Sequence, residues 1–239
     1  MKLKLKRSVP ILFLLYSSYY FLEPFLSGWF EIVDPSIARM VFLPLRWMSF
    51  VLVTLPIAMV FGDVAFYTPD ILFATVLALY LVYYLRVGRY EINEKHKKLA
   101  YLPLIALSFV FIVMIPLGFT SRDRHVNSFP VGGWSRLMMA GGPSRVREEA
   151  LQLLNSTKEE RPDWSEIPPT LKRLGGWVGV EHENRLVIVG LGRMFNMADE
   201  FGFVFQEEDS GEPSPTYLQR FDFQRFWKLA EGVYFYEVP

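Results

Sequence analysis

An uninterrupted apolar run between residues 99 and 120 constrains the fold of this 239-residue chain more than any other feature. The run reads LAYLPLIALSFVFIVMIPLGFT and contains no charged side chain. A helix of about 20 apolar residues crosses the ~30 Å hydrocarbon core of a bilayer. Pro103 and Pro116 lie close to the ends of the run, where a lost backbone hydrogen bond costs least. The run therefore predicts a membrane-spanning helix at 99–120.

Two more predicted spans precede this run. The stretch Met40–Leu85 is mostly apolar and too long to cross a bilayer once. It therefore predicts a helical hairpin with helices at 41–62 and 66–86. Glycine, proline and aspartate residues between the two helices favour a turn at that point.

The N-terminal apolar segment, 9–30, is the most interrupted of the four predicted segments, because it contains Pro10, Glu23 and Pro24. It follows the cationic start MKLKLKRS, as a secretory signal would, but no small-x-small cleavage site comes after it. We expect it to be retained and to span the membrane, to lie in the interface or to re-enter. Residues 1–120 are therefore predicted to form an α-helical membrane domain with three or four spans.

Beyond residue 120 the sequence is typical of a small water-soluble α+β domain. A linker is expected at 121–133, which contains charged residues and a glycine pair. In the helix predicted at 143–155, apolar residues recur at i, i+4, i+7 and i+8. From Trp177 the apolar period changes to two, which predicts an antiparallel sheet of about five strands. The stretches with this period are 177–181, 185–191, 201–206, 220–229 and 233–238. Helices followed by strands predict an α+β domain at 134–239.

Charge divides the chain at the same border. Residues 1–120 hold 11 Lys/Arg against 7 Asp/Glu, and the remainder holds 14 against 18. No dense basic patch of the kind that binds nucleic acid is present. Loop 86–98 holds five of the basic residues, and short basic loops prefer the cytoplasmic side of a membrane. This pattern predicts a plasma (cytoplasmic) membrane protein whose residues 121–239 are extracytoplasmic.

Four ionisable residues fall within or beside the predicted spans, namely Glu23, Arg46, Asp63 and Asp70. A charge at bilayer depth is costly and often marks a pathway or a partner. One interpretation is therefore a proton- or ion-coupled site, in which Asp63 and Asp70 share a helix face. The other places all four at the membrane interfaces, because turn residues adjoin the carboxylates and the long arginine side chain reaches the headgroups.

A second candidate site is an aromatic set in the predicted strands. Phe221, Phe223, Tyr234 and Tyr236 are spaced by two residues within their strands. Aromatic side chains at this period usually form the core face of a sheet, where cross-strand pairs contribute ~0.2–1 kcal/mol each. The sharper hypothesis is that these four side chains form a surface for a protein partner.

Sequence motifs for catalysis or cofactor binding are not found. His182-Glu183 is followed by leucine at position 186, where a zinc-protease helix has its second histidine. Gly190 and Gly192 are not followed by the third glycine that opens a helix in a dinucleotide site. The chain contains no cysteine, which excludes disulfides and thiolate metal sites. We therefore expect no metal and no cofactor.

These observations favour an integral membrane protein whose globular domain has a non-catalytic accessory, scaffold or partner-binding role. The expected partners are the lipid bilayer and either a membrane protein or a second copy of this chain, with no nucleic acid. One alternative is a small transporter or channel subunit that uses the intramembrane acidic residues. A third is a membrane enzyme that acts on lipid.

Overall fold

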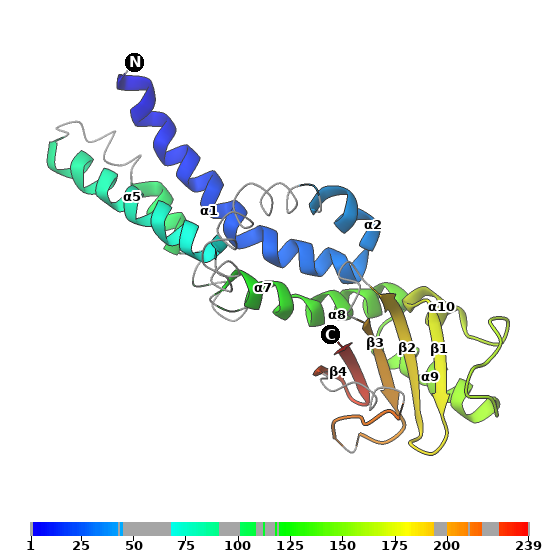
Figure 1. Cartoon of the computed structure of the whole chain (residues 1–239). Helices are drawn as coiled ribbons and strands as arrows, with labels where there is room; N and C mark the ends of the chain where they lie inside the picture. The colour runs from blue at the N-terminus through cyan, green and yellow to red at the C-terminus, as the bar shows by residue number, and fades with distance from the viewer. Residues whose placement is uncertain are drawn as a thin grey trace, which may run out of the picture. The chain divides into compact units, whose positions relative to one another are not determined.

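The computed structural model describes residues 2–42, 44, 68–90, 101–108, 112, 118, 120–193, 200–209, 211–216 and 225–238 (Figure 1). The chain divides into two compact units. The first comprises Met1–Gly28 and Met40–Ser128, and the second comprises Trp29–Arg39 and Phe129–Pro239. Most of the predicted span 41–62 and half of the predicted span 99–120 lie outside the described residues, and so do Arg46 and Asp63; residues 101–108 of the second span are helical.

Long helices form the first unit. They include α1 (Lys2–Val33), whose last residues belong to the second unit, and α5 (Thr68–Tyr90). Within them, Val9–Val33 and Pro69–Arg86 are long and apolar enough to cross a membrane. These two stretches correspond to the predicted segments 9–30 and 66–86. The described residues thus contain two candidate spans, where three or four were predicted for the whole chain.

Stacked aromatic rings join α1 to α5. Phe13 stacks on Tyr80 with ring centroids 3.9 Å apart, and Tyr20 stacks on Phe73 at 4.1 Å. The contacts run in opposite directions along the two helices, so the helices are antiparallel. Large apolar side chains on the outer faces stay exposed, among them Ile11, Leu12, Leu15, Ile71, Leu79 and Leu85. Leucine and isoleucine on an outward face are favoured in hydrocarbon and disfavoured in water.

Helix α7 (Ser121–Asn127) occupies part of the stretch that was expected to be a linker. It begins with a capping box, in which the Thr120 hydroxyl accepts the N–H of Asp123 and the Asp123 carboxylate accepts the N–H of Thr120. Two backbone donors at the start of the helix are satisfied in this way. Asp123, one of the charged residues counted as linker, therefore caps the start of a helix.

The second unit contains an antiparallel sheet of five strands, as predicted. The strands are β1 (Trp177–Glu181), β2 (Leu186–Arg193), β3 (Glu200–Gln206), β4 (Arg225–Ala230) and β5 (Val233–Val238). Their spatial order is β1-β2-β3-β5-β4, so β4 and β1 are the edges of the described sheet. Every residue of β3 and β5 is buried, which places these two strands at the centre of the core.

Three helices cover the face of the sheet that carries Phe235. They are α8 (Phe129–Ala140), α9 (Pro143–Ser156) and α10 (Pro169–Leu174), which contact one another and the sheet (Figure 1). The apolar stripe predicted for α9 is buried, as Val146, Ala150, Leu153 and Leu154 show. The glycine pair taken as a linker signal lies inside α8, where a methyl group at Gly133 would come within 2.8 Å of the Phe235 ring. Those glycines allow close packing, which explains why the linker prediction differs from the structure.

The other face of the sheet has a second apolar core, formed by Leu186, Ile188, Val204, Tyr234, Tyr236 and Val238. One row of cross-strand neighbours on this face places two glycines between aromatic residues: Trp177, Gly190, Gly202, Tyr236 and Phe226. A methyl group at Gly190 would collide with the Trp177 indole, and one at Gly202 would lie 2.5 Å from Cε1 of Tyr236. The two glycines therefore let aromatic rings from neighbouring strands lie against the backbone.

Candidate functional site

The structure describes two of the four charged residues that the sequence analysis singled out. Asp70 lies in the first turn of α5, where the helix dipole favours a carboxylate. Glu23 is half-buried on α1. Arg46 and Asp63 lie outside the described residues, so the predicted pairing of Asp63 with Asp70 stays a prediction. Asp70 lies among polar groups from two other helices.

Two residues from different helices bind the Asp70 carboxylate. The Tyr20 hydroxyl of α1 donates to Oδ1 at 2.5 Å, and the Ser121 N–H at the start of α7 donates to the same oxygen at 2.9 Å. The Ser121 hydroxyl lies 3.4 Å from the second oxygen, Oδ2. Asp70 thereby joins α5 to both α1 and α7.

Arg124 of α7 is the second charged member of this cluster, and only 1% of it is exposed. Its guanidinium carbon lies 4.5 Å from the centroid of the Tyr20 ring and 4.9 Å from that of Phe21. One of its N–H groups donates to the Tyr20 carbonyl oxygen at 3.3 Å. Pro24 has no N–H with which to bond that carbonyl, so Arg124 supplies the donor that the helix lacks.

The next residue of α7 makes a similar contact one turn further along α1. His125 Nδ1 lies 3.1 Å from the Pro24 carbonyl oxygen and 3.4 Å from the Ser27 hydroxyl. Together with Asp70 and Arg124 it forms a set of side chains that we call the α1–α7 clamp, consisting of Tyr20, Asp70, Ser121, Arg124 and His125. The hydrogen bonds of the clamp hold helices together around a proline inside α1.

Sequence reasoning found Asp70 but missed the rest of the clamp, because Ser121, Arg124 and His125 lie in the stretch that was taken for a linker. The available signal was Pro24, which predicts a free carbonyl at Tyr20 in any helix that continues through it. Nothing in the sequence indicates which side chain would bind that carbonyl.

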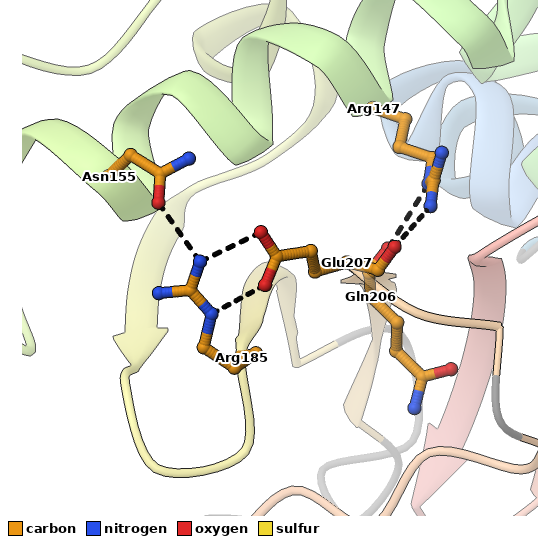
Figure 2. A network of polar contacts seen from close by, with 5 residues as sticks. All are labelled: Arg147, Asn155, Arg185, Gln206 and Glu207. Carbon is orange, nitrogen blue, oxygen red and sulfur yellow. Dashed lines mark hydrogen bonds and ion pairs between the residues drawn. The ribbon is translucent and has the colours of Figure 1, made fainter.

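A second polar network lies in the α+β unit, at the ends of β2 and β3 (Figure 2). Arg185 forms a two-bond ion pair with the Glu207 carboxylate, with N–O distances of 2.5 and 2.7 Å. It also donates to the Asn155 side-chain oxygen at 3.1 Å. The Arg185 guanidinium beside it lowers the pKa of Glu207 below its usual value. This ion pair is exposed, so it orients the two side chains but contributes little to the stability of the fold.

Arg147 of α9 completes the network by binding the backbone where β3 ends (Figure 2). It donates to the carbonyl oxygen of Gln206 at 3.1 Å and to that of Glu207 at 2.7 Å. Gln206 is the last paired residue of β3 and Glu207 follows it. At the end of a strand, backbone carbonyls need donors from outside the sheet. Arg147 therefore connects α9 to the end of the central strand.

A shallow hollow beside this network is lined by Leu154, Asn155, Thr157, Lys158, His182 and Arg185. His182 Nε2 is buried there and has no hydrogen-bond partner among the described residues. Arg185 lines the hollow but already binds Glu207, and Lys158, which also lines it, takes part in none of the ion pairs found among the described residues. In the described part of the chain, no three His, Cys, Asp or Glu residues are placed to hold a metal ion.

The aromatic residues proposed as a partner surface are placed in the core where the structure describes them. Tyr234 is 4% exposed and Tyr236 is 0% exposed, and both belong to the second apolar core. Phe221 and Phe223 lie outside the described residues. The core-face interpretation of the aromatic spacing therefore accounts for Tyr234 and Tyr236, and they offer no surface to a partner.

Tyr234 also belongs to a small polar set that makes the stability of the second unit depend on pH. The ammonium group of Lys228 and the Tyr234 hydroxyl both bind the Asp209 carboxylate, at 2.5 and 2.8 Å. These bonds lower the pKa of Asp209. Burial, and then the Asp209 carboxylate, raise the pKa of Tyr234 to about 12.

We expect the second unit to lose stability at both ends of the pH range for these reasons. The contribution of ionised Asp209 is present above its unfolded pKa and is lost as the pH falls through its lower folded pKa. The contribution of neutral Tyr234 is present below its unfolded pKa and is lost as the pH rises toward about 12. Urea unfolding of the Tyr234→Phe variant should show a smaller stability loss between pH 9 and pH 12 than the unaltered chain. An identical alkaline loss in both proteins would contradict the assignment.

No family model matches the sequence, and no curated protein or solved structure matches it significantly.

Proposed function

We propose that this protein is a membrane-anchored, non-catalytic binding module, in which the helical region holds the α+β unit at a bilayer and that unit engages a protein partner. The observation that carries the proposal is the set of bonding partners of three cationic side chains in the α+β unit. Arg147 binds backbone carbonyls, Arg185 binds Glu207 and Lys228 binds Asp209. Arg147 and Arg185 bind groups at the ends of strands, and Lys228 joins β4 to the loop after β3. Each of these cations is thus engaged in holding the fold together, as a rigid scaffold requires.

The membrane part of the proposal is supported by two observations. Val9–Val33 and Pro69–Arg86 have the length and composition of spans, and large apolar side chains on α1 and α5 are exposed. We further propose the plasma membrane as the location and the extracytoplasmic side for the α+β unit, because the basic residues of loop 86–98 favour the cytoplasm.

The edge strand β4 is the place at which we propose that the partner binds. The other edge, β1, is partly covered, since the Val180 N–H donates to the Glu160 carbonyl oxygen at 2.8 Å. The residues of β4 are half-buried except Lys228, which is exposed. An edge strand accepts an extended peptide through main-chain hydrogen bonds. We propose that the peptide is an extended segment of a membrane-protein partner.

The alternative transporter role depends on a carboxylate that is free to exchange a proton or an ion. The three donors that surround Asp70 favour a structural role for it. Under the binding-module proposal, Asp70→Asn should leave partner binding unchanged, whereas a transporter subunit should lose transport. A lipid-directed enzyme is the third possibility, and activity retained in a 121–239 fragment would favour it.

Site-specific photo-crosslinking in intact membranes tests the proposal. A photoreactive residue at Lys228 on β4 should yield one adduct of defined mass, and the same residue at Glu148, exposed on α9, serves as the matched control. An adduct with twice the mass of the chain would identify a second copy as the partner. Equal labelling at both positions, or none at either, would contradict a binding role for β4.

A further inference from the structure

Helix α8 has an exposed apolar face that its own unit does not cover. Val131, Trp134, Met138 and Met139 are 40%, 40%, 55% and 61% exposed. They lie at i, i+3, i+7 and i+8, which is one side of a helix. The opposite side is buried and consists of Phe129, Gly132, Gly133, Leu137 and Ala140. The helix is therefore apolar on both sides, with one side against the protein.

The buried side of α8 packs on the last turns of α1, and these turns belong to the same unit. A methyl group at Gly132 would lie 2.7 Å from Cβ of Ile32, which shows how closely the two helices approach. The Trp29 indole N–H donates to the Ser135 hydroxyl at 3.0 Å. Arg136 donates to the Ile32 carbonyl oxygen at 2.7 Å, close to the C-terminal end of α1, where a helix lacks its own donors and favours a cation.

These contacts hold α8 against the end of the α1 stretch that is proposed above to cross the membrane. Trp29, Ile32 and Val33 are the last residues of the stretch Val9–Val33, which has the length and composition of a span. If that stretch crosses a bilayer, its final turns emerge at the interface, and α8 is held against those turns by two hydrogen bonds. The exposed face of α8 then lies at the level of the headgroups.

We propose that α8 is an interfacial helix whose Val131, Trp134, Met138 and Met139 side chains enter the headgroup–acyl boundary of the bilayer that α1 crosses. Tryptophan and apolar side chains are favoured at this depth. The lipid surface is the occupant that fits, because four side chains form too small a patch for a stable protein interface, which buries about 800 Å² on each partner. The proposal rests on the membrane anchoring proposed above and adds a second point of contact, which restrains the α+β unit against the bilayer surface.

The absence of cysteine makes a direct test possible, because a spin label attaches only where a cysteine is introduced. Labels are placed at Met138→Cys on α8, at Leu79→Cys on the outer face of α5, and at Glu183→Cys in the β1–β2 turn. Each variant of the full chain is reconstituted in phosphatidylcholine–phosphatidylglycerol vesicles. The accessibility of each label to oxygen and to a water-soluble nickel chelate then reports its depth.

The label at position 138 should show a severalfold higher oxygen-to-nickel accessibility ratio than the label at 183, with the label at 79 the deepest. If 138 matches 183 while 79 is deep, the interfacial helix is wrong but the membrane anchor stands. If 79 is also aqueous, the anchor itself fails and the proposal fails with it. Dipolar broadening at 138 alone would show that a second copy covers α8, which would also overturn the proposal.

Discussion

Replacing Gly202 with alanine is expected to lower the free energy of unfolding of the α+β unit by about 3 kcal/mol. Gly202 lies on β3, and its neighbour on β5 is Tyr236. A methyl group there would collide with the Val189 carbonyl oxygen and lie 2.5 Å from Cε1 of Tyr236. One obstacle is backbone and the other is a ring that is 0% exposed, so neither can move without disturbing the centre of the sheet.

Gly176→Ala is the matched control for this substitution. A methyl group at Gly176 would meet only the Gly190 carbonyl oxygen, at 3.9 Å, which is an ordinary contact distance. Hydrogen exchange measured by mass spectrometry on the full chain separates the two variants, because it reports the opening of β3 without assuming that both units unfold together. Faster exchange across 200–206 in Gly202→Ala than in Gly176→Ala is expected, and equal rates would show that Tyr236 does not lie over Gly202.

The sheet could be predicted from the sequence because the physical signal is local. Alternating apolar residues in stretches such as 201–206 and 233–238 have the period of a strand, and both stretches are strands in the structure. The sequence indicated less clearly that both faces of these two strands are buried. Aromatic residues at period two indicate one buried face, but the small residues between them gave no sign that Phe203 and Val204 would be equally buried.

The contacts that join the helices could not be predicted, because they depend on residues that are distant in the sequence. Tyr20, Asp70 and Ser121 come from three separate segments, and only their helices bring them together. The glycine pair of α8 could not be interpreted correctly for the same reason. Glycines predict a flexible connection when only neighbours are considered, yet Gly132 and Gly133 lie where Ile32 and Phe235 leave no room for a side chain.

Removal of the Arg124 side chain is expected to have an effect of similar size in the first unit. Arg124→Ala deletes a hydrogen bond from a charged donor to the Tyr20 carbonyl oxygen and the stacking of a buried guanidinium on two rings. It also leaves the Tyr20 carbonyl oxygen, which Pro24 cannot bond, without that donor in an apolar environment. We expect a loss of about 3 kcal/mol, which corresponds to roughly a hundredfold decrease in the protection of the α7 amides from hydrogen exchange.

Arg122→Ala in the same helix provides the control, because Arg122 is exposed and carries the same charge. Arg124→Lys separates charge from shape, since an ammonium group retains the charge but cannot stack as a planar guanidinium does. We expect protection of the α7 amides to decrease in the order Arg122→Ala, Arg124→Lys, Arg124→Ala. If Arg124→Lys matched the unaltered chain, charge alone would hold the clamp, and the fit of the guanidinium between Tyr20 and Phe21 would be incidental. If Arg122→Ala were as damaging as Arg124→Ala, the effect would belong to the helicity of α7, and the clamp around Pro24 would not be what joins α7 to α1.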